Sequence, residues 1–174
     1  MYKFAWQDRQ EGLLVSVDTD FAGCRVTRRS TSGGVAMYGS HCIKHWASTQ
    51  TTIALSSGEA ELNGLCKGAS MALGLRSVAD DLGVKYDIII QADATAAIGM
   101  ARRGGIGKVR HLDVSLLWIQ SAVRRKASVL QKVLGTENIA DALTKYLDRP
   151  DLDKHIRGMY LMPETGRAVS APML

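Results

Sequence analysis

The sequence lacks several features that are typical of disulfide-rich, zinc-binding, membrane-spanning and secreted proteins. It has three cysteines, an odd number, and no two of them form a C-x-x-C pair. This pattern argues against a disulfide framework and against a zinc site, and it favours a reducing compartment. No apolar run approaches the roughly 18 residues that a membrane-spanning helix needs. The first eight residues are too polar for a signal peptide. The chain is therefore expected to be soluble and intracellular, not secreted.

The composition is that of one globular domain. The chain has 174 residues, of which 46% are hydrophobic and 22% are charged, so it can bury a core and is not expected to be disordered. It contains no internal repeat and no low-complexity segment. The formal net charge of +5 and the pI of about 9.2 favour a polyanionic partner such as nucleic acid only weakly, because many basic proteins bind none.

The hydrophobic pattern predicts an α/β protein. The expected elements, in chain order, are a strand at 13–19, strands at 33–38 and 42–47 joined by Gly39-Ser40-His41, a helix that ends at Leu82, a strand at 88–92, helices at 94–103 and 109–126, a strand at 128–134 and a helix at 137–146. Ser56 is the expected N-cap of the helix that ends at Leu82, with Ser57 as the alternative. This order predicts a mixed five-stranded sheet, three antiparallel strands followed by two parallel additions, with helices on its faces. Residues 1–12 form a lead-in segment, 13–147 the domain, and 148–174 a tail that is partly ordered at most.

Two of the expected strands end in acidic residues. Asp18 lies at the end of the apolar strand 13–19, and Asp93 directly follows the strand 88–92. A carboxylate in a buried strand is costly unless it is paired or binds a metal. Asp20 points the same way as Asp18, but it lies further from the apolar run and fits a loop carboxylate better. A turn-forming aspartate is the structural alternative for Asp93. The two strands together indicate a shared acidic site.

Two further acids lie on expected helices. Glu61 shares a helix face with a stripe of small and apolar residues, whereas Glu59 is rotated by roughly 200° from it and falls on a wetter face. Glu61 is therefore the one expected to point toward the strands, with a position at the solvent edge of the stripe as the alternative. Spacing alone places Asp141 on a solvated face of the last helix.

A series of short motifs, taken in chain order, resembles the sequence pattern of a known family. The motifs are Asp18-Thr-Asp-Phe-Ala-Gly, Arg29-Ser-Thr-Ser-Gly-Gly, Ala54-Leu-Ser-Ser-Gly-Glu-Ala-Glu, Ala92-Asp, Lys108-Val-Arg-His-Leu-Asp and Ala140-Asp-Ala-Leu-Thr-Lys. Each is weak alone, but as an ordered set over residues 12–147 they resemble the ribonuclease H domain of copia-type LTR retrotransposon polyproteins. The resemblance implies a ribonuclease H-like fold. It also implies an intracellular location, in the cytoplasm, in retrotransposon particles or in the nucleus.

The resemblance implies a metal-dependent nuclease. The expected activity is hydrolysis of the RNA strand of an RNA/DNA hybrid by two Mg²⁺ ions, for which Mn²⁺ can substitute, beside a reverse transcriptase polymerase domain in the parent polyprotein. Mg²⁺ prefers carboxylate oxygens, so acids are the right ligands for this chemistry. By resemblance, the catalytic and metal-binding residues are Asp18, Glu61, Asp93 and Asp141.

The residues expected to contact substrate are small hydroxyls and arginines near these acids. Hydroxyl groups can contact the 2′-OH of RNA, and arginines can contact phosphates. The candidates are Arg29, Thr31, Ser32, Ser56, Ser57, Thr95 and Arg110, and for each hydroxyl a helix cap or a turn is an equally good interpretation. Asp93 is followed by Ala94 and Thr95, where relatives often carry more polar residues. Because of this departure, one alternative is that the chain binds RNA/DNA hybrids without cleaving them. A second alternative is a nuclease that acts on DNA.

Overall fold

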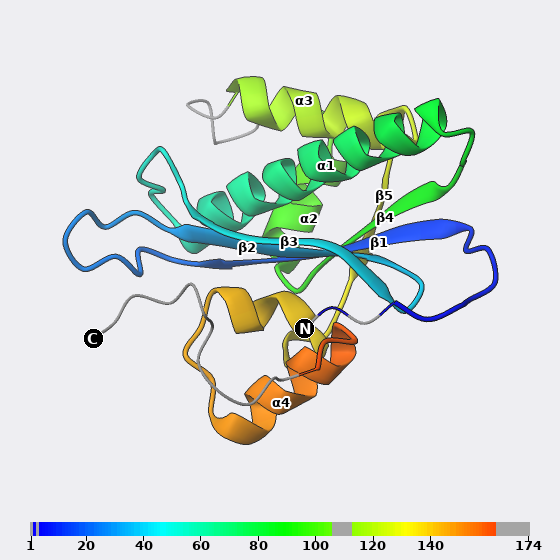
Figure 1. Ribbon diagram of the computed structural model, residues 1–174. Helices are drawn as coiled ribbons and strands as arrows, with labels where there is room; N and C mark the ends of the chain where they lie inside the picture. The colour runs from blue at the N-terminus through cyan, green and yellow to red at the C-terminus, as the bar shows by residue number, and fades with distance from the viewer. Residues whose placement is uncertain (1, 3, 106–112, 163–174) are drawn as a thin grey trace.

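A computed structural model describes residue 2 and residues 4–105 and 113–162. The elements in chain order are β1 (Gly12–Asp20), β2 (Thr31–Tyr38), β3 (His41–Thr49), α1 (Ser57–Asp81), β4 (Asp87–Ala92), α2 (Thr95–Arg102), α3 (Asp113–Arg124), β5 (Val129–Lys132), two short 3₁₀ helices η2 (Gly135–Glu137) and η3 (Ile139–Leu143), and α4 (Arg149–Gly158) (Figure 1). No helix of the described residues is long and apolar enough to cross a membrane.

The strands form one mixed sheet of five, in the order β3-β2-β1-β4-β5. β1 pairs antiparallel with β2, and β2 with β3, whereas β1 and β4, and β4 and β5, pair in parallel. The predicted fold class is confirmed. Because parallel strands end at the same edge of a sheet, Asp18 near the end of β1 and Asp93 just after β4 meet at one edge.

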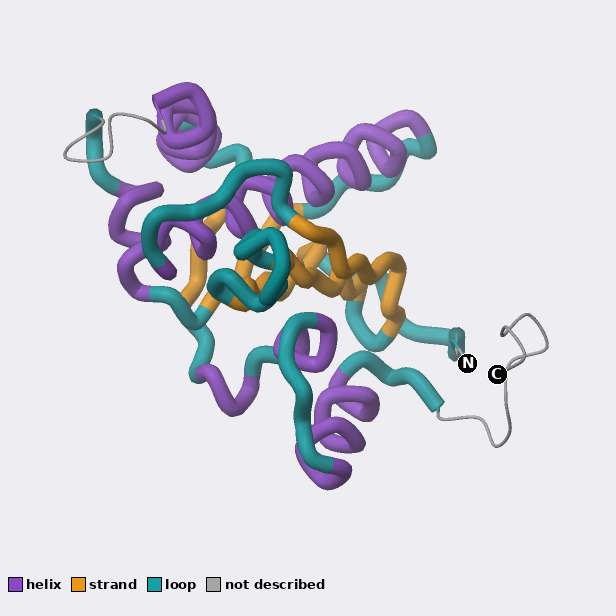
Figure 2. The backbone as a smooth tube through the Cα atoms, turned by 90° about the vertical axis from the view of Figure 1, so that its left-hand side faces the viewer, coloured by secondary structure: helices purple, strands orange, loops and turns teal. Residues whose placement is uncertain are grey.

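Helices cover both faces of the sheet. α1, α2 and α3 lie on one face, and η3 and α4 on the other (Figures 1 and 2). On the first face α1 comes very close to β1, since a Cβ on Gly68 would lie 2.4 Å from Cγ1 of Val17. On the second face, Met159 after α4 packs with the buried side chains of Val35 and Met37 from β2. The central strands are therefore buried from both sides.

The beginning of α1 agrees with the predicted cap. The side chain of Ser56 accepts a hydrogen bond from the backbone N–H of Glu59 at 3.2 Å. The Glu59 carboxylate in turn accepts from the backbone N–H of Leu55 at 2.8 Å, and the Glu59 residue is only 4% exposed. The expectation of a wetter environment for Glu59 is therefore wrong, because this capping contact folds its side chain back onto the preceding loop.

The sequence prediction fails most clearly after β5. The expected helix at 137–146 is replaced by η2 and η3, and β5 is shorter than the expected strand at 128–134. α4 was not expected. Its N-cap is Asp148, whose side chain accepts a hydrogen bond from the backbone N–H of Asp151, and the helix buries His155. The expected helix at 109–126 is seen as α3, and its predicted first residues lie outside the described part. The boundaries of the lead-in, domain and tail remain predictions.

Candidate active site

Three aspartates from three separate segments meet at one edge of the sheet. Asp18 comes from β1, Asp93 from the turn after β4 and Asp141 from η3, and one carboxylate oxygen of each lies within 4.8 Å of the other two. Asp18 and Asp141 are buried and Asp93 is half-buried. Spacing alone placed Asp141 on a solvated helix face, which is wrong because η3 lies against the sheet.

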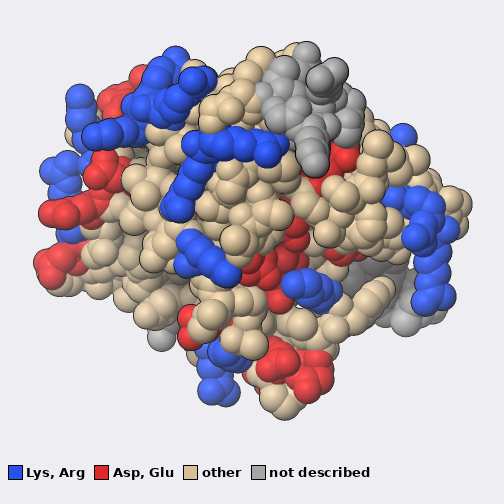
Figure 3. Space-filling model, turned by 180° about the vertical axis from the view of Figure 1, so that it is seen from behind, with Lys and Arg blue, Asp and Glu red and all other residues tan. Residues whose placement is uncertain are grey.

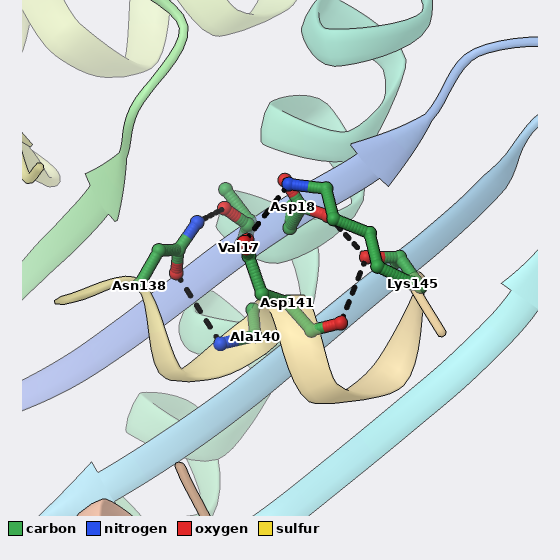
Figure 4. Close-up of polar contacts among 7 residues, drawn as sticks. Val17, Asp18, Asn138, Ala140, Asp141 and Lys145 are labelled. Atoms are coloured by element: carbon green, nitrogen blue, oxygen red, sulfur yellow. Dashed lines mark hydrogen bonds and ion pairs between the residues drawn. The ribbon is translucent and has the colours of Figure 1, made fainter. Parts of the chain in front are cut away.

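A buried asparagine connects η3 to β1. The side-chain amide of Asn138 donates a hydrogen bond to the backbone carbonyl of Val17 at 2.9 Å, and its oxygen accepts one from the backbone N–H of Ala140 at 3.3 Å (Figure 4). Val17 directly precedes Asp18, and Ala140 directly precedes Asp141. One side chain thus sets the distance between the two segments that carry these aspartates.

Lys145 lies between two of the aspartates. Its Nζ is 3.2 Å from Oδ1 of Asp18 and 3.0 Å from Oδ2 of Asp141 (Figure 4). The hydroxyl of Thr144 donates to Oδ2 of Asp18. Both residues belong to the motif Ala140-Asp-Ala-Leu-Thr-Lys, but the sequence predicted no role for either. The spacing of four between Asp141 and Lys145 is a signal that could have indicated this pair.

Glu61 lies in the first part of α1 and interacts electrostatically with the cluster. It is half-buried, and burial, followed by the nearby carboxylates of Asp18 and Asp93, raises the pKa of Glu61 to about 8. Its oxygens are not part of the set that lies within 4.8 Å. Its role as a metal ligand therefore stays a prediction.

The arrangement fits a divalent metal ion. Burial raises the pKa of Asp141 to about 6, although the hydrogen bond from Lys145 opposes this shift. Oδ1 of Asp141 is buried and has no hydrogen-bond partner among the described residues. Clustered carboxylates repel one another and need cations to remain ionised together. Hard carboxylate oxygens are the ligands that Mg²⁺ prefers, so the residues present can hold such an ion.

The raised pKa of Glu61 predicts a pH-dependent stability in the absence of metal. Since the folded protein keeps this proton up to about pH 8 while the unfolded chain loses it near its ordinary value of 4.5, stability is lost as the pH rises between these values. Urea unfolding in EDTA from pH 5 to 8.5 should show this loss, and Glu61→Gln should flatten it. Glu137→Gln removes an exposed carboxylate on η2 and is the control. Equal pH slopes for wild type and Glu61→Gln would contradict the prediction.

The residues expected to contact substrate differ in their exposure to solvent. Arg29, Ser56, Ser57 and Thr95 are exposed, and Thr95 begins α2 directly after the aspartate turn. Arg110 lies outside the described residues. The side chain of Ser32 and the backbone of Thr31 have hydrogen-bond partners within the protein.

The two strand hydroxyls lie beside groups that hold the local structure. Thr31 is half-buried and donates its backbone N–H to Oδ1 of Asp20. Asp20 is the last residue of β1 and pairs with Thr31, so the prediction of a loop carboxylate is wrong. Ser32 is only 2% exposed, and its hydroxyl accepts a hydrogen bond from the side chain of Gln50 at 2.9 Å. Gln50 also donates to the carbonyl of Ala60 in α1. The Ser32 hydroxyl therefore holds the loop before α1 and has little exposed surface for a substrate.

Comparison with known proteins agrees with this fold. Among solved structures, a ribonuclease H1 isolated from compost is similar with a TM-score of 0.60 and 14% identity, covering 84% of this chain and 99% of that one. A structure of LC11-RNase H1 in complex with an RNA/DNA hybrid has a TM-score of 0.53 and 16% identity, covering 83% of this chain and 99% of that one. The N-terminal ribonuclease H domain of a Mycobacterium tuberculosis protein has a TM-score of 0.52 and 17% identity, over 86% and 99%. The chain therefore has the ribonuclease H fold.

Comparison of sequences identifies a relative among retrotransposon polyproteins. The Retrovirus-related Pol polyprotein from transposon TNT 1-94 of Nicotiana tabacum is 27% identical over 147 residues, which are 82% of this chain and 11% of the polyprotein. The chain thus spans about a tenth of the length of that relative. No family model matches the chain. The predicted resemblance to a copia-type retrotransposon polyprotein is confirmed.

Proposed function

We propose that this chain is a ribonuclease H that hydrolyses the RNA strand of RNA/DNA hybrids with the help of two Mg²⁺ ions, as part of a retrotransposon reverse transcriptase. The observation that carries the proposal is the meeting of Asp18, Asp93 and Asp141 within 4.8 Å. Asp18 and Asp141 are 123 positions apart in the chain, and a shared role in binding metal would account for the cost of burying both carboxylates side by side. An intracellular location follows from the same proposal.

The chemistry requires the acids to act as one group. When bound, divalent ions activate a water molecule and neutralise the charge that develops on the phosphate. Asp18, Asp93 and Asp141 would hold these ions, and Glu61 would complete the set from α1. The half-buried position of Asp93 leaves the cluster open on one side, where a phosphate can approach. Mn²⁺, which has similar ligand preferences, is expected to substitute.

Basic side chains support a nucleic-acid partner. Figure 3, which views the molecule from behind the view of Figure 1, shows Lys and Arg side chains on several sides of a central group of acidic atoms. Positive charges around a negative centre favour a phosphate backbone that passes over bound metal ions. The exposed hydroxyls of Ser56 and Thr95, close to the acids in sequence, are proposed to contact the RNA 2′-OH groups. A polymerase domain of the parent polyprotein is the proposed neighbour.

The function is tested by the substrate and by the metal together. A 5′-labelled RNA is presented in an RNA/DNA hybrid, in an RNA duplex and, with labelled DNA, in a DNA duplex, each with Mg²⁺, with Mn²⁺ or with EDTA. We expect metal-dependent cleavage of RNA in the hybrid alone. Tight binding of the hybrid without any cleavage would instead indicate a binding module of the same fold. Cleavage of the DNA duplex would indicate a nuclease that acts on DNA.

A further inference from the structure

Lys145 has no place in the proposed chemistry of the acids, yet it lies between them. Its ammonium group contacts Asp18 at 3.2 Å and Asp141 at 3.0 Å. Among the ion pairs of the described residues, no other lysine or arginine pairs with the three clustered aspartates. The two contacted side chains are 1% and 12% exposed, so this one positive charge interacts with carboxylates that water screens little.

A divalent ion held by Asp18 and Asp141 would lie close to the carboxylate oxygen atoms that Lys145 now contacts. Mg²⁺ binds carboxylate oxygens at about 2.0–2.1 Å, well inside the distance of an ammonium contact. A metal ion bound to Oδ1 of Asp18 or Oδ2 of Asp141 would therefore lie close to Nζ of Lys145, and the two positive charges would repel each other. The lysine and the metal compete for the same pair of acids.

The surroundings allow Lys145 to move away. Its side chain is 40% exposed, whereas the aspartates it contacts are held by β1 and η3. A cavity of about 410 Å³ lies beside it, lined by Lys145 together with Asp20, Thr31 and Tyr146. Tyr146 is fully exposed, so the cavity is open to solvent on that side. The flexible stem of a lysine can carry the ammonium group into this space while the acids stay in position.

We propose that Lys145 is a resident counter-cation: it holds Asp18 and Asp141 together while no metal is bound and is displaced when a divalent ion binds. This inference rests on the proposed function, because it assumes that the acids bind metal. Lys145 acts through the two aspartates and is a positioning residue. It keeps the metal-free protein folded with its acids together, and its displacement lowers the metal affinity.

Two opposite effects follow from removal of the charge. Lys145→Met should lower the melting temperature in EDTA, since Asp18 and Asp141 then face each other without a cation. The same variant should bind Mn²⁺ and Mg²⁺ about tenfold more tightly, the order expected for removal of one positive charge a few ångströms from the ion. Lys145→Arg keeps the charge and should stay closer to wild type in both measurements.

The experiment measures metal binding without substrate. Isothermal titration with Mn²⁺ and then Mg²⁺, and thermal melts with EDTA or metal, are carried out on wild type, Lys145→Met, Lys145→Arg and a matched control. Lys85→Met is that control, because it removes one exposed positive charge just before β4, at the opposite end of that strand from Asp93. If Lys145→Met melts too low for titration, Lys145→Gln, which keeps a hydrogen-bond donor, replaces it.

The outcomes separate this inference from the proposed function. Tighter metal binding by Lys145→Met, with Lys85→Met unchanged, supports displacement. Unchanged or weaker metal binding by Lys145→Met, while wild type binds metal, overturns the inference and leaves the proposed function standing. Failure of wild type to bind Mn²⁺ at all would overturn the proposed function and this inference with it.

Discussion

Replacing Asp18 with asparagine is expected to lower the cleavage of RNA in a hybrid by roughly three orders of magnitude or more, the scale seen when a central charge-stabilising group is removed. Asp18 is 1% exposed and is the acid that both Lys145 and Thr144 contact. An asparagine of the same shape keeps the packing but loses the negative charge that a metal ion needs. Cleavage rates at saturating Mg²⁺ measure the effect.

The fold should survive this change. Loss of one carboxylate relieves repulsion with Asp93 and Asp141, so the melting temperature in EDTA should not fall far. Asp20→Asn is the matched control, since it makes the same substitution two residues further along β1, where the carboxylate accepts a hydrogen bond from Thr31. Full Mg²⁺-dependent cleavage by Asp18→Asn would remove this residue from the site.

Replacing Asn138 with alanine is expected to damage both stability and cleavage. Asn138 is fully buried, donates to the carbonyl of Val17 and caps η3 at Ala140. Leaving a buried carbonyl unpaired and removing a cap together should cost about 2–4 kcal/mol of unfolding free energy. Since the same side chain sets the separation of Asp18 and Asp141, the rate of hybrid cleavage should also fall, even at temperatures where the variant is folded.

Urea unfolding and cleavage rates, measured on the same samples, test this prediction. The control is Asn63→Ala, which removes a half-buried asparagine of α1 whose amide contacts Gln50 at 3.4 Å and none of the clustered acids. Asn63→Ala should change the free energy of unfolding and the rate of hybrid cleavage only slightly. Wild-type stability and cleavage in Asn138→Ala would show that η3 is held against β1 by other contacts.

The sequence by itself determined the sheet and the two acids that end its strands. Alternation over 13–19 and the β-branched run at 88–92 identify buried strands, and an acid at the end of each is visible without any structure. Helical rotation favoured Glu61 over Glu59 as the acid that points toward the strands. Burial, followed by the carboxylates of Asp18 and Asp93, raises the pKa of Glu61, and its place in the site stays a prediction. These features depend on neighbours in the chain, which a sequence shows directly.

The tertiary structure decided what happens after β5. Residues 137–146 have a helical pattern, yet η3 is a 3₁₀ helix, and Asn138 at its start donates a hydrogen bond to the carbonyl of Val17, 121 positions away. The burial of Asp141 and the position of Lys145 beside Asp18 follow from that docking. Periodicity and spacing describe only near neighbours. The contacts that assemble this site join distant parts of the chain, and they form only when the sheet offers a surface on which η3 can pack.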